Sequence, residues 1–362
     1  MRKSTKLILI LATLIFGVTS FFIVTKMAKW TAIEASIFAS RVGFTVPVQA
    51  SGEQNISLLY STLATQNLAI ENFSAVQLMT HSAAGTNRAF NNTIRIVPDS
   101  ETGRIVLRSP ASDILILNAF CGPGSRVVLH RLHNRLDMKI SDSAHEPILK
   151  LSLPAPIEIS LQACKVLDSD GRDLTHVFQQ AVSVELHDLS KSLAIAGRNG
   201  ALTARVDRAG YTMEHKAEFV LGMRVESLDF SRPSFTEQKV LKISTIDSLY
   251  ITREEPLGNK ALKAQNPGDL ALLAEPNAFK IFQLFEMTGM LYLNAQGRFK
   301  SFTAGKGAIV WQGVPKMVNY LAENQTLSLL VAWLGWLLTV PLPFVLKNFF
   351  NRQKAKQHAQ EE

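Results

Sequence analysis

The sequence has few cysteines and no recognisable pattern of metal-binding residues. Only two cysteines occur in 362 residues, and neither a C-x-x-C pair nor an H-E-x-x-H motif is present. The H-x-x-H formed by His130 and His133 supplies two nitrogens, whereas structural zinc sites use four ligands in recognisable pairs. We therefore expect no metal and no cofactor.

The patterns of common enzyme classes are also missing. No G-x-S-x-G marks a nucleophile elbow, and the glycines at 305 and 307 lack the spacing of a phosphate-binding loop. The acidic residues around Gly171 lack the ligand order of an EF-hand, so they indicate a tight turn. A non-enzymatic protein is favoured. An enzyme assembled from scattered residues stays open, because paired carboxylates leave no pattern in a sequence.

Charge is scarce and unevenly distributed. Charged residues make up 19% of the chain, and the net charge is +8. The segment before Leu7 has three cations, and the segment from Lys347 onward has four cations and two acids. The remainder holds 31 Lys and Arg against 28 Asp and Glu. No basic patch with interleaved aromatics is present, so we expect no nucleic-acid partner.

Apolar residues are abundant, at 47%, and include two long uncharged runs. Leu7–Val24 has 18 residues and Leu327–Leu346 has 20. A run of that length crosses a hydrocarbon core of roughly 30 Å at about 1.5 Å per residue. We expect two transmembrane helices, the first a signal-anchor. A cleaved signal peptide, with Val18 and Ser20 before the cut, is the alternative for the first run.

Cations flank both apolar runs on the side away from the centre of the chain. The positive-inside rule then places both termini in the cytoplasm of a bacterium and the central domain in the periplasm. The residues that determine this topology are Arg2, Lys3, Lys6, Lys347, Arg352, Lys354 and Lys356. Membrane lipids are an expected partner, since anionic headgroups attract such cations.

The pattern along the chain predicts a membrane-anchored β-domain. The expected parts are an N-tail (1–6), transmembrane helix 1 (7–24), a juxtamembrane helix (25–47), a periplasmic β-rich domain (48–255), a helix with closing hairpins that could form a subdomain (256–314), a second juxtamembrane helix (315–326), transmembrane helix 2 (327–346) and a basic C-tail (347–362). The Gly- and Pro-punctuated stretch Pro256–Pro276 is a candidate connection between subdomains.

Short runs with a period of two predict strands with one buried face. The expected strands are Thr93–Val97, Arg104–Arg108, Arg126–His130, Pro156–Leu161, Val182–Leu186, Ala201–Val206, Phe219–Leu221, Arg224–Leu228, Lys239–Ile246 and Ser248–Arg253. Turns are expected at Glu101-Thr102-Gly103, Asp170-Gly171, Asn199-Gly200 and Ala295-Gln296-Gly297. The expected fold class is mainly β, an antiparallel meander, sandwich or open β-roll.

One helix is expected to pack on this sheet. Between Asn277 and Met290, apolar residues recur at intervals of three and four, with Asn277 as a possible N-cap and Gly289 as a possible stop.

The two cysteines both fall in the segment expected to be exported. An oxidising periplasm permits a disulfide between Cys121 and Cys164. Such a bond would close a loop of 43 residues and stabilise the fold by roughly 3–5 kcal/mol.

Two segments resemble known envelope families. Thr288–Trp311 has the form strand, N-x-x-G-R turn, strand, and resembles the closing hairpins of AsmA-like proteobacterial inner-membrane proteins. Gly200–Leu228 is similar to one repeat of the β-jellyroll proteins of lipopolysaccharide export. The resemblance implies an apolar β-groove for lipid or an envelope scaffold, and it brings no catalytic residues. Those families usually have one N-terminal anchor, whereas this chain has a second apolar run near its C-terminus.

These observations predict a non-enzymatic inner-membrane protein whose periplasmic β-domain binds a lipidic or protein partner in envelope lipid transport or biogenesis. Two alternatives remain. One is an accessory subunit of a secretion or polysaccharide-export complex. The other is a periplasmic hydrolase or transferase without a recognisable motif.

Overall fold

The computed structural model describes residues 32–48, 56–83, 93–142, 144–208, 217–236, 239–253, 260–265, 269–287, 289–305 and 311–312. These residues belong to one compact unit, 31–313, and a second unit comprises 1–30 and 314–362. Both apolar runs, the helix expected at 315–326 and all the topology-determining cations lie outside the described residues. Within the described ranges, no helix has the length and hydrophobicity to cross a bilayer.

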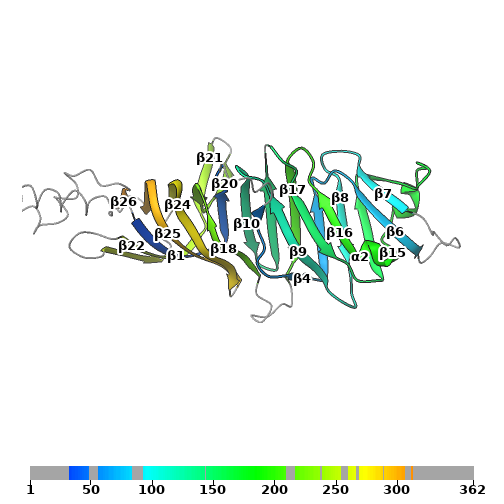
Figure 1. Ribbon diagram of the computed structural model, residues 1–362, viewed down its shortest axis with the longest axis horizontal. Coiled ribbons are helices and arrows are strands. Elements are labelled where there is room, and N and C mark those ends of the chain that lie inside the picture. Colours follow the sequence, from blue (N-terminus) through cyan, green and yellow to red (C-terminus); the bar gives the residue numbers. More distant parts are fainter. Residues whose placement is uncertain are drawn as a thin grey trace, which may run out of the picture. The chain divides into compact units, whose positions relative to one another are not determined.

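The expectation of a mainly β fold is confirmed, since strands make up most of the described chain (Figure 1). The strands are β1 (Ala32–Ala39), β2 (Arg41–Thr45), β3 (Ile56–Ser57), β4 (Leu63–Thr65), β5 (Asn67–Glu71), β6 (Val76–Ala83), β7 (Thr93–Pro98), β8 (Arg104–Arg108), β9 (Ile114–Cys121), β10 (Arg126–Leu132), β11 (Arg135–Ser141), β12 (Ile148–Ser152), β13 (Ile157–Gln162), β14 (Cys164–Leu167), β15 (Val182–Leu186), β16 (Ser192–Ala196), β17 (Ala201–Asp207), β18 (Glu218–Arg224), β19 (Ser227–Asp229), β20 (Ser231–Thr236), β21 (Lys239–Ser244), β22 (Ile246–Arg253), β23 (Lys260–Gln265), β24 (Asp269–Met287), β25 (Met290–Gly305) and β26 (Trp311–Gln312). The helices among these residues are η1 (Thr175–Phe178) and α2 (Asp188–Lys191).

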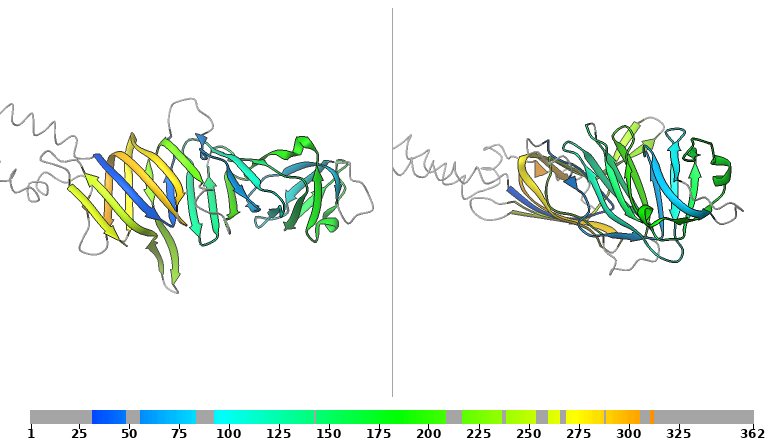
Figure 2. Two further views of the ribbon diagram at one scale, coloured as in Figure 1. Left: turned by 90° about the horizontal axis from the view of Figure 1, so that it is seen from below. Right: turned by 45° about the vertical axis from the view of Figure 1, so that its right-hand side comes forward.

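Nineteen strands form one antiparallel sheet. Successive pairings give the order β23–β22–β1–β25–β24–β19–β2–β10–β11–β17–β5–β8–β13–β15–β6–β7–β14, with β18 also paired to β24 and β26 to β25. Neighbours in this sheet are often far apart in the sequence. In Figures 1 and 2 the blue strand β1 accordingly lies among the yellow and orange strands of the C-terminal half.

A second sheet shares the hydrophobic core with the first. Its order is β16–β12–β9–β3, with β4 also paired to β9. Inward residues of both sheets, such as Ile116 and Leu149 from the small sheet and Ile70 and Ile140 from the large one, belong to one buried cluster. Each of these four side chains is at most 1% exposed, so the two sheets pack into a continuous interior.

The juxtamembrane helix expected at 25–47 is wrong within the described residues, where β1 and β2 are found instead. In β1 the small and apolar residues Ile33, Ala35 and Ile37 are buried, whereas Glu34 and Ser36 between them are not. This period of two suits a strand held between β22 and β25. The alanines favoured a helix in the sequence, but pairing on both sides overrides that preference.

The packed helix expected at 277–290 is also wrong, because this segment lies in the long strand β24. Its pairing with β25 shifts register between Ile281 and Gln283. Ile281 and Leu284 therefore both point into the core, while Phe282 and Gln283 between them are exposed. A β-bulge in a strand that is apolar on both faces produces the three-and-four spacing of a helix.

The connection expected over Pro256–Pro276 contains strand β23 and the first part of β24. Strand β23 pairs with β22, and β24 pairs with β25. The segment therefore extends the large sheet on both sides of β1 and β25.

The hairpin turn expected at Asn199-Gly200 is confirmed. The φ angles of Asn199 and Gly200 are 52° and 70°, both in the left-handed region that a type I′ turn requires. Arg198 and Ala201 exchange backbone hydrogen bonds of 2.9 and 3.0 Å across the turn. A side chain at position 200 has no room, since a Cβ atom there would lie 1.7 Å from the carbonyl oxygen of Asp142.

A buried cluster of charges connects distant parts of the large sheet. Glu286 in β24 lies 2.6 Å from Nε of Arg131 in β10 and 3.0 Å from Nε of Arg208, which follows β17. All three side chains are at most 8% exposed. A charge in such a position is tolerated only when it is paired, so this triad fixes the position of β24 against β10 and β17.

Candidate functional site

The disulfide expected between Cys121 and Cys164 is not formed. Both residues are free and buried, with Cys121 at the end of β9 in the small sheet and Cys164 at the start of β14 in the large one. Burial raises the pKa of the Cys121 thiol to about 12 and also raises that of Cys164. The disulfide was expected because an oxidising periplasm permits one. The spacing of two cysteines in the sequence does not show whether their Cα atoms lie close enough for a bond.

Cys121 adjoins a turn that is organised by Asp142. The carboxylate of Asp142 accepts hydrogen bonds from the backbone of Gly122 at 2.8 Å and from the hydroxyl of Ser125 at 2.7 Å. It also accepts hydrogen bonds from the backbone N–H groups of Ala144 and His145, at 2.9 Å each. Burial opposes ionisation, but these four bonds outweigh it and lower the pKa of Asp142.

The residues of this turn resemble a catalytic set in type but not in geometry. The Ser125 hydroxyl is buried, and its oxygen lies 2.6 Å from the Gly122 carbonyl oxygen and 2.7 Å from Oδ2 of Asp142, so its one proton is shared by two acceptors. His145 approaches Asp142 at 3.7 Å through Nδ1 and forms no hydrogen bond with Ser125 within the described part of the chain. The arrangement holds together two chain reversals, the turn at Gly122–Ser125 and the one that follows Asp142.

The other histidine and acidic motifs also lie in structural settings. His130 lies in β10 opposite Asp137, and burial lowers its pKa, with Arg41 and Arg232 adding to the effect. Asp168 accepts hydrogen bonds from the backbone of Asp170 and Arg172, which is an acidic turn of the expected kind. The described residues contain no cluster of His, Cys, Asp and Glu suited to a metal ion.

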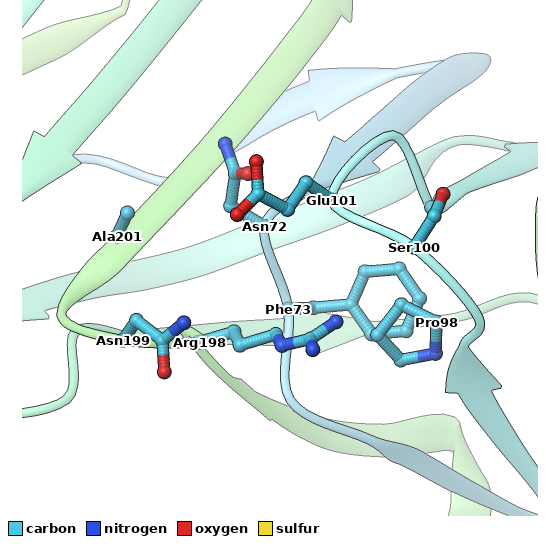
Figure 3. Close-up of a pocket in the computed structure, with 9 residues that line it drawn as sticks. Asn72, Phe73, Pro98, Ser100, Glu101, Arg198, Asn199 and Ala201 are labelled. Atoms are coloured by element: carbon cyan, nitrogen blue, oxygen red, sulfur yellow. The ribbon is translucent and has the colours of Figure 1, made fainter.

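Three turns converge on a small cavity, which we call the turn pocket (Figure 3). They are the link from β5 to β6, the turn from β7 to β8, and the hairpin from β16 to β17. The cavity volume is about 190 Å³, and its lining residues are Asn72, Phe73, Pro98, Ser100, Glu101, Gly103, Arg198, Asn199 and Ala201.

Backbone hydrogen bonds fix the walls of the turn pocket. The N–H of Arg198 donates to the carbonyl of Asn72 at 2.8 Å, which joins the hairpin to the β5–β6 link. The N–H of Gly103 donates to the carbonyl of Ser100 at 3.2 Å, which closes the β7–β8 turn. A pocket built from such turns is largely formed before any ligand arrives.

The side chains of the turn pocket combine an apolar wall with two unpaired charges. Phe73 is fully buried, and Figure 3 shows Arg198 extending toward the side formed by Phe73 and Pro98. Nη1 of Arg198 is buried and has no hydrogen-bond partner in the described part of the chain. Glu101 lies on the exposed turn that forms another wall. Neither charge forms an ion pair with a described residue.

A second surface lies on the outer side of the large sheet, and we call it the aromatic face. It consists of Phe38, Tyr250, Phe282, Phe285 and Tyr292, from β1, β22, β24 and β25. The rings of Phe38 and Tyr292 lie 4.9 Å apart, and those of Tyr292 and Phe285 lie 5.0 Å apart. The residues beside them in sequence, such as Ile37, Leu291 and Leu284, are buried. The rings therefore lie on the side of the sheet away from the core.

The aromatic face continues toward β18. Leu221 is 52% exposed and pairs in register with Gln283, which is next to Phe282. Tyr60 is 65% exposed, and its N–H donates to the carbonyl of Glu218 at 2.9 Å. A cavity of about 200 Å³ lies here, lined by Tyr60, Glu218, Val220, Leu221, Gln283, Leu284 and Phe285. Exposed apolar groups gathered in this way are typical of an interaction surface.

Sequence reasoning located some parts of these sites and missed others. It predicted two of the three turns that form the turn pocket, but nothing in the sequence marked Asn72, Phe73 or Arg198. It also read the strand that contributes Phe282 and Phe285 as a helix. The apolar residues on both sides of β24 were the available signal for an exposed aromatic face.

Comparison with known proteins assigns neither a family nor a function to this chain. No protein-family model matches this chain, and no curated protein sequence matches it significantly.

Proposed function

We propose that this chain is a membrane-anchored, non-enzymatic envelope protein whose β-domain binds lipid through the aromatic face. The observation that supports the proposal is the row of rings from Phe38 through Tyr292 to Phe285, which continues to the exposed Phe282 and Leu221. Phenylalanine and tyrosine have apolar rings, and tyrosine adds a polar tip, which suits the boundary between headgroups and acyl chains.

The connectivity of the chain favours a bilayer as the partner. Strand β1 begins at Ala32, eight positions after the apolar run ends at Val24, and β26 ends at Gln312, fifteen positions before the next run begins at Leu327. Eight residues reach at most about 29 Å and fifteen at most about 54 Å when extended. If both runs span the membrane, the chain tethers β1 and β26, which both pair with β25, within these distances of the bilayer.

The charges on this surface indicate that rings, rather than electrostatic attraction, drive the interaction. Lys263, Lys280 and its cross-strand neighbour Arg224 are exposed on or beside the aromatic face, and so are Glu34 and Glu218. Nζ of Lys280 lies 5.5 Å from the centre of the Phe282 ring. Three cations against two anions give little net attraction to anionic lipid, so contact with the bilayer depends mainly on buried apolar area and only weakly on salt.

A spin-label experiment on the full-length protein in proteoliposomes tests this proposal. The label is attached at Tyr250→Cys or Leu221→Cys, where the native residues are 47% and 52% exposed. The buried native cysteines have raised pKa values, so they remain unlabelled in the folded protein. Contact with the bilayer raises the accessibility of the label to oxygen, which partitions into lipid, relative to a water-soluble nickel chelate.

Arg172→Cys is the matched control, because Arg172 is 77% exposed and lies in an acidic turn away from the aromatic face. We expect the ratio of oxygen to nickel accessibility to be several-fold higher at positions 250 and 221 than at 172. Equal ratios at all three positions contradict the proposal. If labels at 250 and 221, but not at 172, have low accessibility to both reagents, a protein partner covers this surface. That result would favour the accessory-subunit alternative.

A further inference from the structure

The turn pocket offers two opposite charges to one small ligand. Arg198 and Glu101 line the same cavity, but the structure records no ion pair between them. On the β7–β8 turn itself, Asp99 forms an ion pair with Lys165 of β14 at 2.8 Å, which neutralises the acid next to the cavity. Within the described residues, one cation and one anion are therefore left to face a ligand.

The guanidinium of Arg198 calls for an acceptor. A buried donor of a charged group without a partner is unfavourable, and Nη1 is in this state. The fully buried Phe73 and the neighbouring Pro98 keep this side of the cavity apolar, which strengthens the attraction between the guanidinium and an anionic oxygen. A phosphoryl or carboxylate group would supply that oxygen.

Glu101 makes a purely anionic ligand unfavourable. Its carboxylate lines the same cavity and is exposed to solvent, so a second anion would be repelled there, whereas an ammonium group would be attracted. Asn199 adds an amide group that donates and accepts hydrogen bonds, and Asn72 adds a second, whose NH2 group also donates to the Thr203 hydroxyl at 3.3 Å. The cavity of about 190 Å³ is below the roughly 300–1,000 Å³ of pockets for drug-sized ligands, so the ligand or the part that enters is small.

We propose that the turn pocket binds a small zwitterion, with its phosphoryl group on Arg198 and its ammonium group toward Glu101. Phosphoethanolamine is the simplest molecule with this chemistry, and it occurs both free and as a lipid headgroup. The site is separate from the aromatic face, and it does not depend on contact between that face and a bilayer.

Calorimetric titration of the full-length protein in detergent with O-phosphoethanolamine tests the proposal. Wild type is expected to bind, and Arg198→Ala is expected to lose at least about tenfold in affinity, as for loss of a charge-assisted contact. Arg198→Lys keeps the charge but not the planar donor group, so its affinity lies between the two. Arg172→Ala, which removes an arginine from an exposed turn elsewhere, leaves binding unchanged.

A second variant separates the two charges of the ligand. Glu101→Gln is expected to weaken binding of O-phosphoethanolamine and to strengthen binding of inorganic phosphate, because it removes the repulsion of the second anion. Because Glu101 is exposed on a surface turn, this variant keeps the fold. The proposal is overturned if wild type does not bind O-phosphoethanolamine, if Arg198→Ala binds it as tightly as wild type, or if a neutral sugar such as glucose binds better.

Hydrogen exchange distinguishes the two sources of the ligand. The full-length protein is placed in nanodiscs of phosphatidylethanolamine or of phosphatidylglycerol, which lacks the ammonium group. If the ligand is a lipid headgroup, residues 99–103 and 198–201 are protected in phosphatidylethanolamine alone. If it is a free metabolite, they are protected only after O-phosphoethanolamine is added. Lack of protection under every condition contradicts the proposal, whatever the spin labels report for the aromatic face.

Discussion

Nε of Arg208 lies 3.0 Å from Oε2 of Glu286, although 78 residues separate them in the sequence. Arg131 approaches the other carboxylate oxygen of Glu286 at 2.6 Å. Arg208 also donates to the carbonyl of Ala64 at 3.1 Å. One carboxylate therefore connects β24 with β10 and with the end of β17, and Arg208 extends this connection to the β4 segment, which makes Glu286 a sensitive position in the fold.

Replacing Glu286 with glutamine is expected to lower the free energy of unfolding by about 3–5 kcal/mol, because two buried arginines lose their counter-charge. Chemical denaturation of the full-length protein in detergent measures the change. Asp188→Asn is the control, since Asp188 pairs with Lys191 but is 86% exposed, and an exposed pair contributes about 0–1 kcal/mol. Equal stability of the two variants would show that the triad does not fix β24.

Replacing Gly200 with alanine is expected to destabilise the protein by more than about 2 kcal/mol, as for other strained backbone positions. Its φ of 70° disfavours a side chain, and the new Cβ would lie 1.7 Å from the carbonyl oxygen of Asp142. Asn199→Gly is the matched variant, because glycine adopts the same φ of 52° without strain. Thermal unfolding compares them, and a G200A protein as stable as N199G would contradict the observed turn.

Replacing Asp142 with asparagine is expected to cost about 1–3 kcal/mol at neutral pH, because the neutral amide cannot accept all four hydrogen bonds. The pKa of Asp142 is lowered in the folded state, so the folded protein binds fewer protons than the unfolded chain. Its contribution is present above the unfolded pKa of about 3.9 and is lost as the pH falls through the folded value.

The stability difference between wild type and D142N should therefore narrow as the pH falls below about 4. Denaturation curves at a series of pH values measure this difference. A difference that stays constant down to the lowest pH would show that the ionised carboxylate is not the stabilising group. Asp188→Asn, at an exposed position, serves as the control for the general effect of losing one negative charge.

The two cysteines are expected to react slowly with iodoacetamide in the folded protein and rapidly in denaturant. A pKa of about 12 for Cys121 leaves roughly a thousandfold less thiolate near neutral pH than an ordinary cysteine has. Mass spectrometry counts the alkylated thiols with and without prior reduction. If the two thiols are alkylated only after prior reduction, a disulfide joins Cys121 to Cys164, and the finding that both are free is wrong.

The strands that the sequence predicted best have one apolar and one polar face. Arg104–Arg108 and Val182–Leu186 were predicted with their observed bounds. The first follows the turn at Glu101–Gly103, and in the second Val182, Val184 and Leu186 alternate with Ser183 and Glu185. Strands β1 and β24 were read as helices for opposite reasons. In β1, several alanines favoured a helix. In β24, apolar residues on both faces and a β-bulge gave the spacing of a helix.

The candidate sites depend on contacts that no local pattern encodes. The turns at Glu101–Gly103 and Asn199–Gly200 could be predicted one at a time from their glycines. Their convergence with Asn72 requires β17 to pair with β5 and β5 with β8, and these pairings join segments about 35 to 140 residues apart. Such pairing is decided by packing of the whole sheet rather than by propensity.

The position of β1 has a consequence for how the protein is made. Both neighbours of β1, β22 and β25, are encoded more than 200 residues after it. At about 5–20 residues per second, the ribosome needs roughly 10–50 s to complete these partners after β1 has been synthesised. During that interval the two edges of β1 have none of their native hydrogen-bonding partners, so this half of the sheet assembles only after its last strands exist. A nascent chain of this protein would therefore benefit from a chaperone that shields Ile33–Ala39, and truncation before Met290 would leave that segment exposed to aggregation.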